Sequence, residues 1–178
     1  MTKIQNFSSE LVFLGVASSG PDGYPLAIGL GFPETRSSKI VFIKPLEKWG
    51  LLNDIKDHNS DDPSGSKRKN KIIEGIQAID LITKGVEPDK AFKIICEIIE
   101  EKAIYSVFPK EDIHLPGKLS SKTREKIDIQ SAITLFDSIV PPEREMELQV
   151  NTKMDIRYYP RNKADTKWLI ELYHRCQN

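Results

Sequence analysis

The chain has 178 residues, of which 39% are hydrophobic and 29% are charged, and its 26 basic side chains balance its 26 acidic ones. These values are typical of a single globular domain spanning residues 1–178, and they exclude a disordered or fibrous protein. A formal net charge of zero excludes a global attraction to nucleic acid or to an anionic membrane, so any such affinity would need a local basic patch.

The first half of the chain predicts three strands. Residues 11–16 are almost continuously apolar, as in a strand that is buried on both faces. The turn sequence Pro21-Asp22-Gly23 separates them from residues 26–30, so the two segments should form an antiparallel hairpin. Residues 40–43 predict a third strand. Residues 57–71 are polar and rich in turn formers, and we expect them to form an exposed loop.

The second half predicts helices around a fourth strand. From Ile72 to Ile82, isoleucines recur at helical spacing, and a second helical pattern begins at Pro88. Residues 103–107 predict a strand, and residues 131–139 and 164–176 predict further helices. This order of elements predicts an α/β domain with a mixed sheet. The first strand should be central because it is the most uniformly apolar.

The segment from position 11, "LVFLGVASSGPDGYPLAIGLGF", resembles the first motif region of the DEDD-type 3′–5′ exonucleases, which have the ribonuclease-H-like fold. The segment "IIEGIQAIDLITKGVEPDKAFKIICEIIEEKAIYSVFPKED" resembles the paired helices and second acidic motif of that family. The segment "YYPRNKADTKWLIELY" resembles its closing helix. The resemblance covers nearly the whole chain. It implies a ribonuclease-H-like mixed central sheet flanked by helices.

The catalytic positions of that family are mostly replaced in this sequence. The first aspartate of the family corresponds to Gly15, and the glutamate two residues later corresponds to Ala17. The general-base histidine corresponds to Pro160. The second-motif aspartate and the last aspartate are retained, as Asp112 and Asp165.

These replacements remove what the chemistry of such enzymes requires. Two-metal phosphodiester hydrolysis needs oxygen ligands for Mg²⁺, and neither Gly15 nor Ala17 carries a side-chain oxygen. Pro160 cannot deprotonate a water. The resemblance therefore implies a catalytically inactive exonuclease-like protein with no cofactor, or with Mg²⁺ or Mn²⁺ bound only weakly. The alternative is a metal-dependent 3′–5′ exonuclease with a rearranged metal site that uses Asp112 and Asp165.

Several polar residues also have structural interpretations. Asp112 would suit the N-cap or first turn of the helix in which it is expected, and Asp165 would suit an ion pair with Arg161 or a neighbouring lysine. Ser18 and Ser19 fit a turn, since no base is positioned to activate them. The three histidines lie too far apart in sequence to suggest a zinc site. The two cysteines fall in helix-like segments, which favours buried thiols, although a disulfide stays possible if they lie close together.

The expected partners fall into two classes. Two basic runs could contact the phosphates of a single-stranded nucleic acid, and their candidate residues are Lys67, Arg68, Lys69, Lys118, Lys122 and Arg124. The other class is a protein-interaction module, which includes a homodimer because several relatives in the exonuclease family act as dimers. No apolar run approaches the roughly 18–20 residues of a membrane span, and no leader-like segment follows Met1. The sequence therefore predicts a cytoplasmic protein without a membrane partner.

Overall fold

The computed structural model describes residues 11–19, 23–47, 72–73, 75–114, 118–119, 127–140, 142–144 and 163–177. Several predictions concern residues outside these ranges, namely the loop 57–71 with Lys67, Arg68 and Lys69, and also Lys122, Arg124, Pro160 and Arg161.

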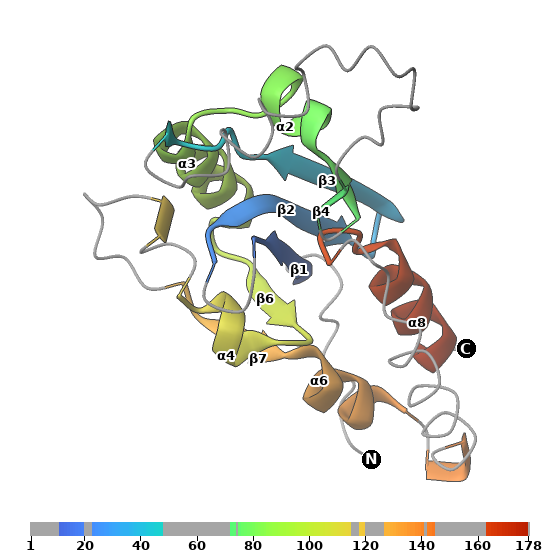
Figure 1. Cartoon of the computed structure of the whole chain (residues 1–178). Coiled ribbons are helices and arrows are strands. Elements are labelled where there is room, and N and C mark those ends of the chain that lie inside the picture. Colours follow the sequence, from blue (N-terminus) through green and yellow to red (C-terminus); the bar gives the residue numbers. More distant parts are fainter. Residues whose placement is uncertain are drawn as a thin grey trace, which may run out of the picture.

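The centre of the molecule is a mixed five-stranded sheet with the order β3-β2-β1-β6-β7 (Figure 1). Its strands are β1 (Leu11–Ser18), β2 (Pro25–Phe32), β3 (Ser37–Phe42), β6 (Ala103–Ser106) and β7 (Ile129–Ser131). The strand β2 is antiparallel to β1 and to β3, whereas β6 is parallel to β1 and to β7. The predictions of an α/β fold, an antiparallel hairpin and a central first strand are therefore confirmed.

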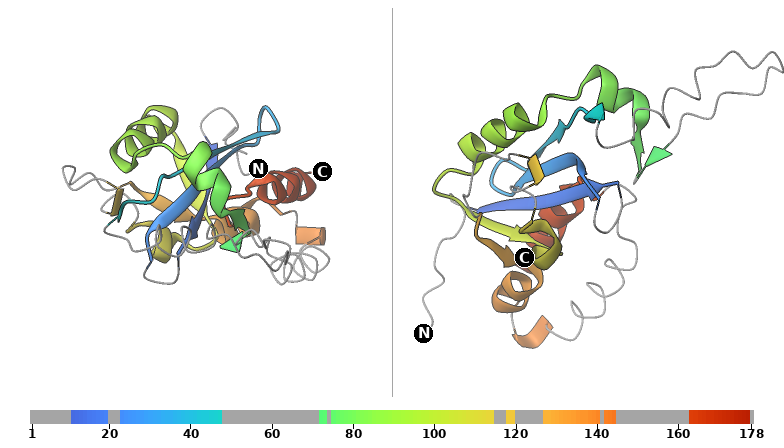
Figure 2. Two further views of the ribbon diagram at one scale, coloured as in Figure 1. Left: turned by 45° about the horizontal axis from the view of Figure 1, so that its top comes forward. Right: turned by 60° about the vertical axis from the view of Figure 1, so that its left-hand side comes forward.

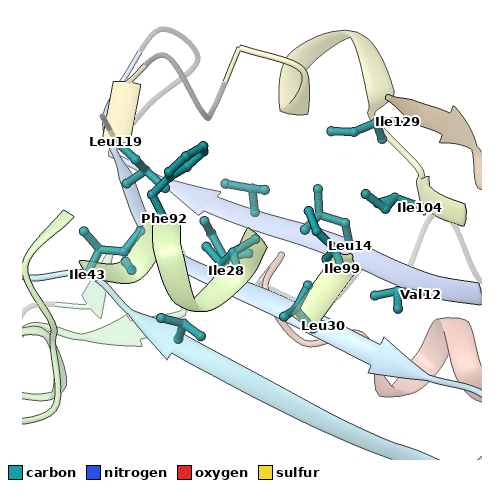
Figure 3. Close-up of a cluster of buried hydrophobic side chains, with 14 residues drawn as sticks. Val12, Leu14, Ile28, Leu30, Ile43, Phe92, Ile99, Ile104, Leu119 and Ile129 are labelled. Carbon is teal, nitrogen blue, oxygen red and sulfur yellow. The ribbon is translucent and has the colours of Figure 1, made fainter. Parts of the chain in front are cut away.

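Helices cover both faces of the sheet (Figure 2). The helix α3 (Pro88–Ile99) lies on one face, called here the α3 face, and α8 (Lys167–Gln177) lies on the other, called the α8 face. Alternate residues of a strand point to opposite faces. Val12, Leu14 and Val16 accordingly pack with residues of α3 in the cluster that Figure 3 shows. Phe13 packs on the α8 face with residues of α8 and of α6 (Ala132–Ile139).

The prediction of a helix from Ile72 onward was wrong for its first half. The short strands β4 (Ile72–Ile73) and β5 (Ile76–Gln77) pair antiparallel, and the helix α2 begins only at Ala78 and ends at Thr83. Gly75 has a φ of 77°, which a glycine adopts without steric cost and which allows the tight connection between the two strands.

The face that α2 buries also differs from the predicted one. Ile79 and Ile82, which carried the helical pattern, are 48% and 43% exposed, whereas Leu81 is completely buried. Leu81 packs with Ala17 and Leu26 on the α8 face. The apolar spacing of the isoleucines therefore identified the helix but not its buried side.

The other helices agree with the prediction apart from their bounds. Helix α3 begins at Pro88, and α6 begins after Ser131, whose Oγ accepts a hydrogen bond from the Thr134 amide at 3.4 Å. Strand β7 was not predicted, because three residues are too few to show an alternation. The short elements α4 (Pro109–Asp112) and η4 (Pro142–Arg144) complete the described structure.

Neither Cys96 nor Cys176 is part of a disulfide in this structure. Cys176 is buried on α8, and Cys96 is half-buried on α3, so only one of them is as deeply buried as the sequence predicted. Within the described ranges, no helix has the length and apolar character needed to cross a membrane.

Candidate functional site

Gly15 lies on the central strand β1, where the resemblance places the first metal-binding aspartate. An ideal Cβ atom at Gly15 would lie only 2.1 Å from the backbone oxygen of Lys163. Gly29, the direct neighbour of Gly15 across the β1–β2 pair, faces Ala164 in the same way, and a Cβ there would lie 1.7 Å from the Ala164 oxygen. A Cβ at Gly31 would lie 2.8 Å from the Thr166 side-chain oxygen. Gly15 and Gly29, on adjacent strands, thus allow a backbone segment to lie directly on the sheet, and Gly31 leaves room for the Thr166 side chain.

This segment, residues 163–166, is called the covering segment below. It leads directly into α8, whose Leu169, Leu172 and Tyr173 are buried in the core of the α8 face. The Phe13 ring contacts the rings of Phe136 and Tyr173, each with centroids 5.8 Å apart. The packing of α8 therefore fixes the covering segment over Gly15.

Two residues of the covering segment are deeply buried against the sheet. Ala164 is fully buried and Thr166 is 1% exposed. The Thr166 Oγ1 atom is buried and has no hydrogen-bond partner within the described part of the chain. Such a hydroxyl costs about 1–3 kcal/mol to bury, so apolar packing of the surrounding residues has to offset it.

Ala17 lies in an equally closed environment. It is fully buried and belongs to an apolar cluster with Leu26, Ala27, Leu81 and Ala164. A glutamate at this position would bring a carboxylate into this cluster, at a large desolvation cost. The two first-motif positions thus lie under packed protein atoms and form no open acidic pocket.

Asp112 is retained, but its carboxylate takes part in a hydrogen bond within the protein. Its Oδ2 atom accepts a hydrogen bond from the Ser106 hydroxyl, and the Ser106 Oγ accepts one from the Phe108 amide at 3.0 Å. Asp112 is the last residue of α4 and is 7% exposed. Of the two structural interpretations of Asp112, the N-cap was wrong, because Phe108 is the N-cap of α4, whereas Asp112 does lie within the single turn of this four-residue helix.

Asp112 lies toward the α3 face of the sheet. Ser106 alternates on β6 with Tyr105, which belongs to the α8 face, and so it shares the α3 face with Ile104. Asp112 also lines a small cavity with Leu14 and residues of α3. Its carboxylate is therefore on the face opposite to the one that Gly15 presents.

Asp165 belongs to the covering segment and thus to the α8 face. Its Oδ1 atom accepts a hydrogen bond from the Lys167 amide at 3.2 Å, at the start of α8. Asp165 therefore makes a local bond to the helix start. The ion pair expected with Arg161 lies outside the described residues, and within the described ranges Asp165 forms no ion pair with Lys163 or Lys167. The sheet separates Asp112 from Asp165, so the two retained acids do not converge on one position. Among the described residues, no group of three or more His, Cys, Asp or Glu side chains is arranged to hold a metal ion.

The remaining candidates have contacts within the protein. Of the six basic candidates, the described ranges include only Lys118, whose Nζ donates to the Gly23 carbonyl at 2.8 Å. Ser19 is a turn residue, as predicted, since its amide donates to the Tyr24 carbonyl and its hydroxyl accepts from the Tyr24 amide, both at 2.9 Å. Ser18, which was predicted in the same turn, is instead the last residue of β1. The His174 Nε2 lies 2.9 Å from the Pro33 carbonyl oxygen and joins α8 to the β2–β3 turn.

The sequence interpretation missed two features of this region. One is the contact of Gly29 and Gly31 with the covering segment, for which the recurrence of glycine at alternate positions of β2 was an available signal. The other is Ser106 as the partner of Asp112. No sequence signal identifies this pair, because it depends on how the chain turns from β6 into α4.

The covering segment therefore lies over Gly15, at the position where the resemblance suggests a metal site. No protein-family model matches the chain, and no curated protein matches it significantly.

Proposed function

We propose that this chain is a catalytically inactive protein of the ribonuclease-H-like fold, with a role in binding another protein. The strand order β3-β2-β1-β6-β7, with β2 as the antiparallel strand, is the arrangement expected of that fold. Helices on both faces of the sheet agree with it as well.

One observation is the main support for the proposed loss of catalytic activity. A side chain at position 15 would collide with the Lys163 carbonyl, which lies 2.1 Å from the ideal Cβ. Two-metal hydrolysis needs space for two ions and a scissile phosphate beside the ligands. Here the covering segment occupies the position beside Gly15, and α8 packing holds it there.

The positions of the retained acids support the same proposal. Asp112 accepts a hydrogen bond from a buried serine on the α3 face, and Asp165 bonds the start of α8 on the α8 face. Because the sheet lies between the two carboxylates, a single metal ion cannot contact both of them. The alternative of a rearranged exonuclease site on these two acids therefore has no geometric support.

A protein partner is favoured over a nucleic acid by the same geometry. An inherited nucleic-acid cleft would lie beside Gly15, where the covering segment lies instead. Lys118 donates a hydrogen bond to the Gly23 carbonyl within the protein. The chain has no net charge that would draw it to phosphates.

The test is an assay with end-labelled single-stranded DNA and RNA oligonucleotides, in the presence of Mg²⁺ or Mn²⁺. We expect no shortening of either oligonucleotide by the wild-type protein or by the matched control, the double variant Asp112→Ala/Asp165→Ala. Metal-dependent shortening that the double variant abolishes would overturn the proposal and establish the rearranged site.

The choice of partner is tested by fluorescence anisotropy with the same oligonucleotides across a salt series. We expect no binding at physiological salt. Tight binding that weakens steeply with salt, and that is lost in the triple variant Lys67→Ala/Arg68→Ala/Lys69→Ala, would instead identify a nucleic-acid-binding module.

A further inference from the structure

The outer edge of β3 is the feature of the described structure that fits a partner best. Strand β3 is the end strand of the sheet. The Ile43 amide donates inward to the Leu26 carbonyl of the β2 segment at 2.8 Å, whereas the Phe42 carbonyl accepts from the Val86 amide on the outer side at 2.9 Å. Backbone groups alternate in direction along a strand, so those of Ser38 and Ile40 point outward like those of Phe42.

Only one end of this edge is covered within the described ranges. Val86 forms a bridge beside Ile43 and also accepts from the Lys44 amide at 2.9 Å, which closes the edge near the end of β3. No described strand or loop hydrogen-bonds to the outward N–H and C=O groups of Ser38 and Ile40. Such groups form a template for an added strand.

The charge of this edge indicates the chemistry of the added strand. Lys44 pairs with Glu87 at 3.0 Å, so this cation is already neutralised. Lys39 is exposed in the middle of the open part of β3 and has no acidic partner among the described residues. In an antiparallel addition, the incoming residue opposite Lys39 would have its Cβ about 4.5–5.5 Å away on the same face. An aspartate or glutamate there would pair with Lys39.

The neighbouring position indicates an apolar residue. Ile40 is half-buried and points to the α8 face, where it packs against the cluster that contains Ala17 and Leu81. An apolar side chain opposite Ile40 would extend this cluster, since alternate residues of an added strand share a face. The edge therefore fits an extended segment in which apolar and acidic residues alternate.

The same register argues against a second copy of the chain as the occupant. If two β3 strands paired antiparallel through Ser38 and Ile40, their Lys39 side chains would lie directly opposite each other. Like charges in this position are destabilising. The covered end beside Val86 also prevents a shift of the register toward Phe42.

We propose that the β3 edge binds an extended acidic segment of a partner protein as an added antiparallel strand, with an Asp or Glu opposite Lys39 and an apolar residue opposite Ile40. The backbone bonds supply affinity in this mode of recognition, and the alternate side chains supply selectivity. This inference rests on the proposed role as a protein-binding module, and it names the chemistry of the partner.

The experiment uses two fluorescein-labelled peptides, Val-Glu-Val-Glu-Val and Val-Lys-Val-Lys-Val, and measures binding to the full chain by anisotropy. We expect the glutamate peptide to bind the wild-type protein and the lysine peptide to bind much more weakly. The variant Lys39→Glu should weaken the glutamate peptide roughly 3- to 10-fold and should favour the lysine peptide instead. The matched control Lys93→Glu makes the same charge change on the exposed side of α3 and should leave both affinities unchanged.

A second variant tests the backbone. Ile40→Pro removes an outward N–H without removing a bond to β2, as edge strands tolerate, and it should reduce binding of the glutamate peptide about tenfold or more. Circular dichroism checks that this variant stays folded, and Lys39→Glu tests the proposal independently if it does not. Absence of peptide binding, equal binding of both peptides, or affinities that neither variant changes would overturn the proposal. So would a dimer in sedimentation velocity that Ile40→Pro dissociates. The peptide results do not affect the outcome of the oligonucleotide assay. Failure of the proposed β3-edge site can therefore be distinguished from failure of the proposed loss of exonuclease activity.

Discussion

At the scale of single residues, Gly15 has a structural role, because it allows the Lys163 backbone to pack against β1. A metal-binding side chain at this position would need free space on the α8 face, yet the Lys163 carbonyl lies where a Cβ atom would be. The neighbouring Gly29 meets the Ala164 backbone in the same way, whereas a Cβ atom at Gly31 would meet the Thr166 side chain. Glycine is therefore required at positions 15 and 29 for the close approach of two backbone segments.

This arrangement makes a definite prediction for Gly15→Ala. The added methyl group must displace the covering segment or strain β1, so we expect the free energy of unfolding to fall by about 2 kcal/mol or more. Urea denaturation measures the change. The control Lys93→Ala, on the exposed side of α3, should stay within about 0.5 kcal/mol of the wild type. An unchanged midpoint for Gly15→Ala would mean that the covering segment does not lie on the sheet.

The residues of the site were predictable only in part. The sequence shows that Gly15 and Ala17 cannot bind a metal, since this depends only on their side-chain chemistry. It does not show that the covering segment lies over them, because this contact joins Gly15 to Lys163, which are far apart in the sequence. The hydrogen bond between Ser106 and Asp112 likewise depends on the tertiary path of the chain.

At the scale of elements, the long apolar strands and the amphipathic helices were predicted best. Strand β1 is buried along nearly its whole length, so a continuous apolar run identified it. The region from Ile72 to Thr83 was harder, because the same isoleucines fit a helical period and a short hairpin. Gly75, with its positive φ, divides this region into β4, β5 and α2.

The buried face of α2 can be tested on that helix alone. Leu81 is completely buried, so Leu81→Ala should lower the free energy of unfolding by about 2–5 kcal/mol. Ile79 is 48% exposed, and Ile79→Ala, the matched control on the same helix, should cost well under half as much. Thermal and urea denaturation measure both changes. A larger loss for Ile79→Ala than for Leu81→Ala would restore the face that the sequence pattern first indicated.

At the scale of the whole molecule, the sheet separates two cores. The core on the α3 face is mainly aliphatic, but it also contains Phe92 and the partly buried Phe32 and Cys96, and the buried Asp112 lies beside it. The core on the α8 face contains several groups that can lose a proton, among them Tyr105, Tyr173 and Cys176. Burial raises the pKa of each of these three groups, from ordinary values of 10.0, 10.0 and 9.0. The protein therefore keeps all three neutral in its folded state over a wider pH range than in its unfolded state.

These raised pKa values predict a loss of stability in alkaline solution. The unfolded chain releases these protons first, so the stabilising contribution is complete below about pH 9 and disappears as the pH rises through the raised pKa values. Urea midpoints measured from pH 7 upward should stay level to about pH 9 and then fall. In Cys176→Ala the fall should begin later, near the ordinary tyrosine pKa of 10.0, because Tyr105 and Tyr173 are the groups with a raised pKa that remain within the described ranges. The cavity left by the missing sulfur lowers the midpoint of the variant equally at every pH, so the comparison uses the pH of onset and not the midpoint itself. If wild type and variant lost stability in parallel from the same pH, Cys176 would not be the thiol that the α8 face keeps neutral.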